Sequence, residues 1–197
     1  MLLREREAFA SFLLGAAALT TCLLVASCGA SASTPTSPPC DQACQDDTAV
    51  RALRSSMKLA YNLTLQGKPV GAHDETIPCP LGGTARVFGT ATSNAAQGAT
   101  NVDLVYSLDH CQYRAQDTDP LQTFHLTATG SLHQVGTLAV QPSSTTALGI
   151  QGDGVTLTGD VYDPAIPYDA EACSIVVQQD GNAIAGTICG RTVGLTL

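Results

Sequence analysis

Hydrophobic and polar residues alternate along most of the chain from about residue 84 onward. An alternation with period two predicts β-strands that bury one face. The apolar series that carry this pattern are Val102, Leu104, Tyr106 and Leu108; Phe124, Leu126, Ala128 and Leu132; and Val155, Leu157 and Val161. Turn-forming glycine, asparagine, aspartate and serine residues stand at 94, 98, 130, 143–144, 152–154 and 180–182. Short strands with such punctuation predict a mainly β fold, an antiparallel meander that forms a barrel or a sandwich.

A helical periodicity precedes the strands. Apolar residues from Val50 to Tyr61 recur every three or four positions, which predicts one short amphipathic α-helix over about 48–62. Asp46-Asp47 stands before it and offers side-chain oxygens for an N-cap. A basic stripe runs beside the apolar face and consists of Arg51, Arg54 and Lys58. We interpret this stripe as a solvated flank of the helix, and contact with anionic lipid is the alternative.

The first 28 residues show a third pattern. An uncharged apolar run begins at Phe9 and ends in Val25-Ala26-Ser27-Cys28, which resembles the lipobox of bacterial lipoprotein precursors. In that family the cysteine receives a diacylglycerol with acyl chains such as palmitate, and the signal peptide is then removed. The resemblance implies cleavage after Ser27 and a lipid on Cys28. An uncleaved membrane anchor and ordinary secretory cleavage, with Cys28 left as a thiol, are the alternatives.

The lipobox divides the chain into a signal peptide (1–27), a lipidated cysteine with a Ser/Thr/Pro linker (28–39), and one exported β-rich domain (40–197). A linker of this composition buries little apolar area and serves as a spacer. Gly29 follows the cysteine, at a position where aspartate often means inner-membrane retention in the resembled family. We therefore expect a lipid-anchored protein of the cell envelope, at the outer membrane, on its periplasmic or surface face.

Six cysteines remain in the exported domain, and an even number in an exported chain predicts disulfide bonds. The expected pairs are Cys79–Cys111, Cys173–Cys189 and Cys40–Cys44. The first pair flanks a hairpin predicted from strands at 84–92 and 101–108, whose ends come together. The last pair is what remains after the other two, and it closes only a small loop.

The final hairpin leaves two registers open. A two-residue turn at 180–181 places Val177 opposite Ile184 and sends Cys189 to the face away from the apolar residues. A three-residue turn places Cys173 directly opposite Cys189 but scatters the apolar pairs. A one-residue slip moves every side chain to the other face, so a bulge beside a nearby glycine is needed to satisfy both patterns.

Charge and composition narrow the classes of partner. The formal net charge is −8, which argues against nucleic-acid binding and against docking of the domain itself on anionic lipid. The chain has no tryptophan, which disfavours a stacking platform for carbohydrate. A zinc site needs two close ligand pairs, and Cys40 with Cys44 is the single close pair. No metal and no cofactor are expected.

Candidate catalytic groups are sparse. The sequence contains no Gly-x-Ser-x-Gly, Ser-x-x-Lys or His-Glu-x-x-His motif. His110 precedes Cys111, but neighbours on a strand point to opposite faces, so they are not expected to act as base and nucleophile. His125 and His133 lie too far apart along one strand to share a metal. The acidic groups, interpreted as solvated turn residues in preference to calcium ligands, are Asp117 with Asp119 and Asp160 with Asp163, Asp169 and Glu171.

The most distinctive loop offers Tyr162, Asp163 and Tyr168 as a candidate recognition rim, although a proline-braced turn is the plainer interpretation. Together these features predict a membrane-anchored envelope lipoprotein with a non-enzymatic structural or binding domain. Its expected partners are the membrane, through the lipid anchor, and an envelope component or a small apolar ligand. Two alternatives are a carrier of an apolar ligand inside a β-barrel and a hydrolase of envelope polymers that uses the loop carboxylates.

Overall fold

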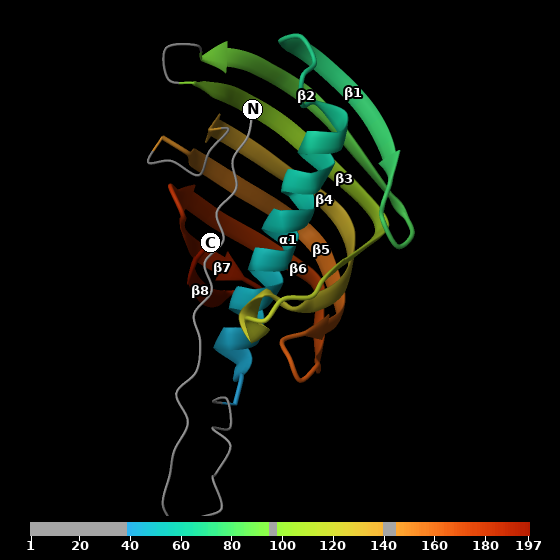
Figure 1. Cartoon of the computed structure of the whole chain (residues 1–197), viewed down its shortest axis with the longest axis vertical. Helices are drawn as coiled ribbons and strands as arrows, with labels where there is room; N and C mark the ends of the chain where they lie inside the picture. The colour runs from blue at the N-terminus through green and yellow to red at the C-terminus, as the bar shows by residue number, and fades with distance from the viewer. Residues whose placement is uncertain (1–38, 95–97, 140–144) are drawn as a thin grey trace, which may run out of the picture. The chain divides into compact units, whose positions relative to one another are not determined.

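In the part of the chain that the structure describes, eight antiparallel strands follow one another in chain order and form a single sheet (Figure 1). Their bounds are β1 (Gly71–Pro78), β2 (Thr84–Asn94), β3 (Ala99–Ala115), β4 (Phe124–Ala139), β5 (Ala147–Val161), β6 (Ile166–Asp180), β7 (Ala183–Ile188) and β8 (Arg191–Thr196). The predicted antiparallel meander is therefore confirmed. The computed structural model describes residues 39–94, 98–139 and 145–197; the lipobox and the predicted turn at 143–144 lie outside them.

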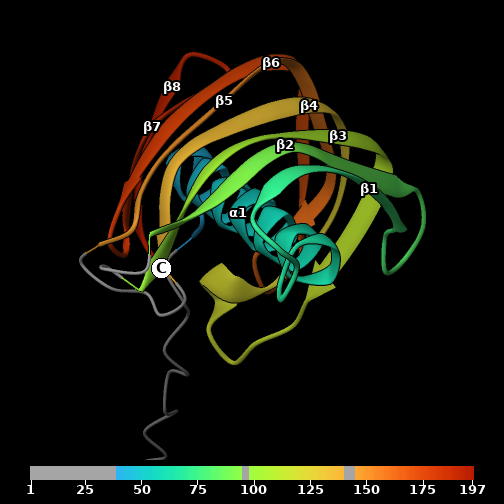
Figure 2. The same ribbon diagram turned by 90° about the horizontal axis from the view of Figure 1, so that it is seen from above.

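The sheet is open and strongly curved. Within the described residues, β1 and β8 each pair with a single neighbouring strand. Figure 2 shows the strands arching over one long helix, α1 (Gln42–Thr64). The meander thus takes the form of one sheet curled around a helix, and it is neither doubled face to face nor closed by pairing of its first and last strands.

Helix α1 is longer than the predicted span of about 48–62. Asp41 is its N-cap, in place of the predicted Asp46-Asp47, and its carboxylate accepts a hydrogen bond from the Cys44 backbone N–H at 3.0 Å. The expected Cys40–Cys44 disulfide closes across this first turn. The helix therefore starts directly after Cys40, and the two predicted cap residues lie inside it.

The helix fills the concave side of the sheet. It contacts β1 to β6 and β8, and its alanines at 49, 52 and 60 are almost fully buried. Such small side chains let a helix approach a sheet closely, while Val50, Leu53 and Met57 interdigitate with the apolar residues of the strands. The predicted apolar face of the helix is confirmed, and it packs into the centre of the core.

Helix α1 also covers the β8 edge of the sheet. The Asp47 carboxylate accepts a hydrogen bond from the Gly194 backbone N–H at 3.0 Å. One turn later, Arg51 donates through Nη2 to the Thr196 carbonyl oxygen at 2.7 Å. Unpaired backbone groups on an edge strand can pair with a strand of another chain. The Asp47 and Arg51 side chains form hydrogen bonds with two such groups on β8.

Two features of the strands differ from the sequence-based expectation. β4 continues past Gly130 and β5 continues past Gly154, although both glycines were predicted as turns. The sheet accommodates them as irregularities in the strand register. Their φ angles are +124° and +67°, a region that favours glycine. β1 was not predicted at all, since its residues 73–76 are polar and show no apolar alternation; it pairs with β2 along its full length.

The final hairpin shows how Cys173 and Cys189 meet in the expected disulfide. Its turn is at residues 181–182, one residue later than predicted, so Val177 does not lie opposite Ile184. The register shifts by two residues, and each side chain therefore keeps its predicted face. Cys189 itself lies in the next turn with a φ of +51°, outside the paired ladder, where its sulfur reaches Cys173. The third expected disulfide, between Cys79 directly after β1 and Cys111 within β3, is also present.

Candidate functional site

A cavity of about 410 Å³ opens beside the flank of α1 that the sheet leaves uncovered. One wall is the connection from β3 to β4, including the short 3₁₀ helix η2 (Pro120–Gln122). The opposite wall comes from the end of β4, the end of β6 and the turn that follows. These distant segments meet because the curled strands carry both of their ends around α1 (Figure 2). The volume lies at the lower end of the range of about 300–1,000 Å³ that is typical of ligand sites.

The helix contributes three cations to this cavity. Arg51, Arg54 and Lys58 follow one another at intervals of three and four residues, which places them on the same side of the helix. Lys58 is exposed and Arg51 is half-buried, whereas Arg54 is only 7% exposed. Arg54 donates through Nε to the Gln179 side-chain oxygen at 2.7 Å. The prediction of a solvated basic flank is therefore wrong for Arg54, which reaches inward over the end of β6.

None of these three cations forms a salt bridge with a carboxylate in the described part of the chain, although Arg51 interacts electrostatically with Asp47. The ion pairs found there are Lys68–Glu75, Arg86–Asp74, His110–Asp109, His133–Asp103 and Arg191–Asp46. Arg54 is the extreme case, because it is buried and its one hydrogen-bond partner is a neutral amide. Burial lowers the pKa of its guanidinium, since a poorly solvated site disfavours a charge without a counter-ion. An anion in the cavity would provide that counter-charge.

The rest of the lining combines polar side chains, such as Gln116, Gln122 and Asn182, with apolar ones. Phe124 and Leu138, from the two ends of β4, face the helix cations across the cavity, and Leu197 adds a third large apolar side chain. One carboxylate, Asp117, also lines the wall formed by the β3–β4 connection. It accepts a hydrogen bond from the Asp119 backbone N–H at 3.0 Å, which lowers its pKa and keeps it negatively charged. The cavity therefore combines three positive charges, one negative charge and an apolar wall.

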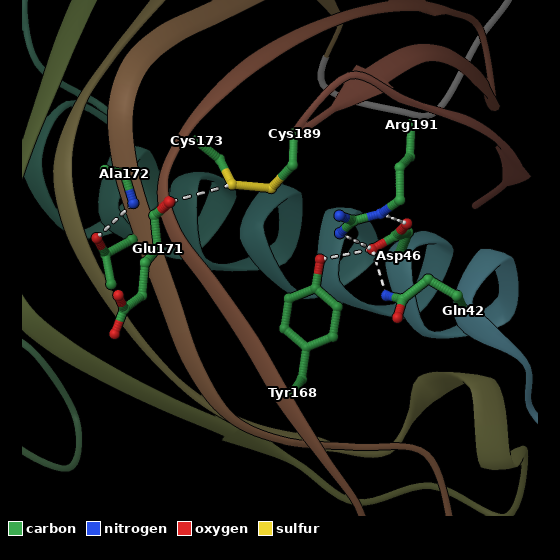
Figure 3. The surroundings of a disulfide bond; sticks show 9 residues. Gln42, Asp46, Tyr168, Glu171, Ala172, Cys173, Cys189 and Arg191 are labelled. Atoms are coloured by element: carbon green, nitrogen blue, oxygen red, sulfur yellow. Dashed lines mark hydrogen bonds and ion pairs between the residues drawn. A yellow bond between two sulfur atoms is a disulfide. The ribbon is translucent and has the colours of Figure 1, made fainter.

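A buried polar network holds α1 against the end of the sheet (Figure 3). Asp46 is fully buried and accepts two hydrogen bonds from Arg191, at 2.6 and 2.8 Å. The Tyr168 hydroxyl donates to the same carboxylate at 2.8 Å, and the Gln42 amide donates at 3.1 Å. Arg191 opens β8, two residues after Cys189, whose disulfide ties this turn to β6. The network therefore fixes the helix that carries the three cations.

The network changes the ionisation of its members. Burial alone would raise the pKa of Asp46, but the hydrogen bonds from Arg191, Tyr168 and Gln42 outweigh burial and leave that pKa below its usual value. Burial, together with the hydrogen bond to the Asp46 carboxylate, raises the pKa of the Tyr168 phenol. Asp46 is thus an ionised, fully hydrogen-bonded carboxylate at neutral pH, which is the condition for a stable buried ion pair.

The two tyrosines of the candidate recognition rim are buried. Tyr168 is 3% exposed with its hydroxyl inside the polar network, and Tyr162 is 7% exposed. Both tyrosines are part of the packing around the turn between β5 and β6, and the proline-braced turn is what the structure shows, with a cis bond between Asp163 and Pro164. Asp163 remains exposed and lines a smaller cavity of about 220 Å³ together with Asp160.

The other acidic candidates do not converge. Asp169 and Glu171 are exposed on β6, and Asp119 caps the short helix η2. In the described residues, no group of three or more His, Cys, Asp or Glu side chains is arranged to hold a metal ion. His125 is exposed, and His133 forms a hydrogen bond with Asp103 at 2.7 Å.

The cysteine that follows His110 in the sequence is held in a disulfide bond. Cys111 is bonded to Cys79, so it carries no thiol that could act as a nucleophile. His110 has a φ of +48° and shares a hydrogen bond with Asp109 at 2.8 Å.

The buried location of Arg54 could not be predicted from the sequence, because Arg54 has the same spacing as its two more exposed neighbours in the stripe.

Comparisons with known proteins do not place the chain in a family. No family model matches the sequence, no curated protein matches it, and no solved structure matches its fold. None of the helices in the described residues is both long enough and apolar enough to cross a membrane.

Proposed function

We propose that this chain is a lipid-anchored protein of the bacterial cell envelope whose β-domain binds a small anionic ligand without transforming it. The observation that carries the proposal is the cavity beside α1, where three cations that form no salt bridge within the described residues meet and one of them, Arg54, is buried. A buried charge without a partner is costly to stability. Such a group is commonly retained where it serves a binding site.

The filled interior favours this cavity over a ligand enclosed by the strands. The side chains of α1 occupy the concave side of the sheet that an enclosed apolar ligand would need. The hydrolase alternative has weaker support, because only Asp160 and Asp163 of the four proposed carboxylates line a common cavity. We therefore place the binding site at the cations of α1.

The envelope location rests on the resemblance of Val25-Ala26-Ser27-Cys28 to a lipobox. The three disulfides support it, because they persist in oxidising compartments outside the cytosol. We expect Cys28→Ser to abolish labelling of the full chain by radioactive palmitate and to move it from the membrane fraction to the soluble fraction. Unchanged labelling and fractionation of this variant would contradict the lipid anchor.

Calorimetric titration with inorganic phosphate and with acetate tests the anion site. The protein for this experiment is the mature chain from residue 28 with Cys28→Ser, which keeps every described residue and lacks the acyl group. Arg54→Gln and Lys58→Gln should each weaken anion binding, because each removes a cation from the cavity. Arg86→Gln is the matched control: it makes the same change in net charge at an exposed arginine that is paired with Asp74. Equal weakening by the control, or no binding by the wild type to any anion, would contradict the proposal.

A further inference from the structure

The cavity separates charge from apolar surface. All three cations come from α1, whereas Phe124, Leu138 and Leu197 come from β4 and from the segment after β8. A small inorganic anion would satisfy the first group and leave the exposed part of the apolar wall, Leu138 and Leu197, in contact with water; Phe124 is already buried. Covering such apolar surface with a ligand removes it from water and makes the free energy of binding more favourable. The lining therefore matches a ligand with two chemically different ends.

Arg54 fixes the position of the charged end. A guanidinium has five N–H donors, and the hydrogen bond to Gln179 uses one of them. The buried polar side-chain atoms that lack a partner in the described residues are Tyr106 Oη and Gln134 Oε1, so the remaining Arg54 donors are not sealed in the core. Since Arg54 lines the cavity, these donors face it and are available to a planar or tetrahedral oxyanion.

We infer that the ligand is an anionic amphiphile, with a carboxylate or phosphate head group at Arg54 and a short apolar chain along Phe124, Leu138 and Leu197. This inference rests on the proposed anion site and adds the chemical class of its ligand. Arg51 and Lys58 lie on either side of Arg54 along the helix and add to the positive field at the head group. Asp117 adds a carboxylate to the lining, which disfavours a second negative charge on the ligand.

The volume sets the length of the chain. A cavity of about 410 Å³ equals roughly fourteen water volumes of about 30 Å³ each. A head group with a chain of about eight to ten carbons fits within this volume. Each methylene that becomes buried should tighten binding roughly fourfold, until the apolar wall is covered.

Calorimetry on the same unacylated mature chain tests the inference with a series of ligands. The carboxylates run from acetate through butanoate and hexanoate to octanoate and decanoate, and octyl phosphate is compared with inorganic phosphate. Octylamine and octanol have the same chain without a negative head group. We expect affinity to rise with chain length up to about eight to ten carbons, and octylamine and octanol to bind at least tenfold more weakly than octanoate. Tighter binding of octanoate than of octyl phosphate indicates a free fatty acid, and the reverse order indicates a phosphomonoester.

The outcomes separate this inference from the proposed function. If acetate and phosphate bind as tightly as their eight-carbon counterparts, the anion site stands and the amphiphile is wrong. If octanol and octylamine bind as tightly as octanoate, the site is only apolar, and both the inference and the proposed function are wrong. If none of the ligands binds, both are likewise wrong.

Two variants test the two ends of the site separately. Arg54→Gln should weaken octanoate binding about tenfold or more, because it removes hydrogen bonds to a charged group, while the gain per methylene remains. Leu138→Ser should leave acetate binding unchanged and reduce the gain per methylene. Arg86→Gln and Val176→Ser, at an exposed arginine and an exposed valine outside the cavity, serve as controls. Should Arg54→Gln fail to fold, Lys58→Gln at an exposed position provides the same test, and an unchanged affinity for octanoate would then overturn the inference.

Discussion

The hydrogen-bonded carboxylate of Asp46 is expected to be one of the strongest single contributors to stability among the polar side chains described. In Asp46→Ala, Arg191 loses its partner, and the Tyr168 hydroxyl loses the acceptor to which it donates at 2.8 Å. Tyr168 is 3% exposed, so water does not readily replace that acceptor. The substitution therefore leaves a buried donor unsatisfied and removes one of the contacts between α1 and β8, while those of Asp47 and Arg51 remain.

The magnitude follows from the burial of each partner. A buried hydroxyl without an acceptor costs about 1–3 kcal/mol. The bond between Asp46 and Arg191 is charge-assisted, but the Arg191 side chain is 41% exposed, and solvent screening reduces its contribution to about 1 kcal/mol. Asp46→Ala should thus lower the free energy of unfolding by about 3 kcal/mol.

Urea unfolding followed by circular dichroism, on the unacylated mature chain with its disulfides intact, measures this loss. Asp74→Ala is the matched control, because Asp74 also binds an arginine, Arg86, through two hydrogen bonds, at 2.7 and 2.6 Å. That pair is exposed on both sides, so its removal should produce no measurable change. Equal losses in the two variants, or a loss below about 1 kcal/mol in Asp46→Ala, would refute the reasoning.

Four further predictions concern the Asp46 carboxylate, a disulfide, a glycine of β7 and the proposed lipid anchor. Because the folded-state pKa of Asp46 lies below its unfolded value, the stability that it contributes is present above about pH 4 and is lost as the pH falls further; the difference in unfolding free energy between wild type and Asp46→Asn should shrink in acid. Replacing Cys79 and Cys111 by serine should cost about 3–4 kcal/mol in urea unfolding, because this disulfide spans a sequence separation of 32 residues. Gly186→Ala should lower the melting temperature, since a Cβ there would lie 2.1 Å from a carbonyl oxygen of β6 at a φ of +155°. Exchange of Cys28 for serine should release the chain from membranes, as fractionation will show.

The hydrophobic pattern was sufficient for elements whose apolar residues alternate strictly. The hairpin of β2 and β3 was predicted with its flanking disulfide because Val102, Leu104, Tyr106 and Leu108 all face the core. β1 was missed because its stability comes from backbone pairing with β2, and a polar edge strand has no alternation to detect. A strand held by backbone pairing alone has no hydrophobic pattern from which it could be predicted, even in a local hairpin.

The candidate site was predicted only in part. The basic stripe on α1 was identified from the sequence, but the burial of Arg54 depends on how far the sheet curls. Register irregularities at glycines such as Gly130 contribute to this curvature, and in the sequence these glycines resemble turns. Tyr168 illustrates the opposite error. Its place in a polar loop suggested an exposed ring, whereas Asp46, more than a hundred residues earlier in the chain, provides a buried acceptor for its hydroxyl.

The most direct test of the central claim is a crystal structure of the unacylated mature chain grown with 8-bromooctanoate, with anomalous diffraction used to locate the bromine. We expect a carboxylate oxygen about 3 Å from the Arg54 guanidinium, with the bromine beside Phe124, Leu138 and Leu197. Bromine bound at another surface, or a cavity that contains only water at saturating ligand, would contradict it.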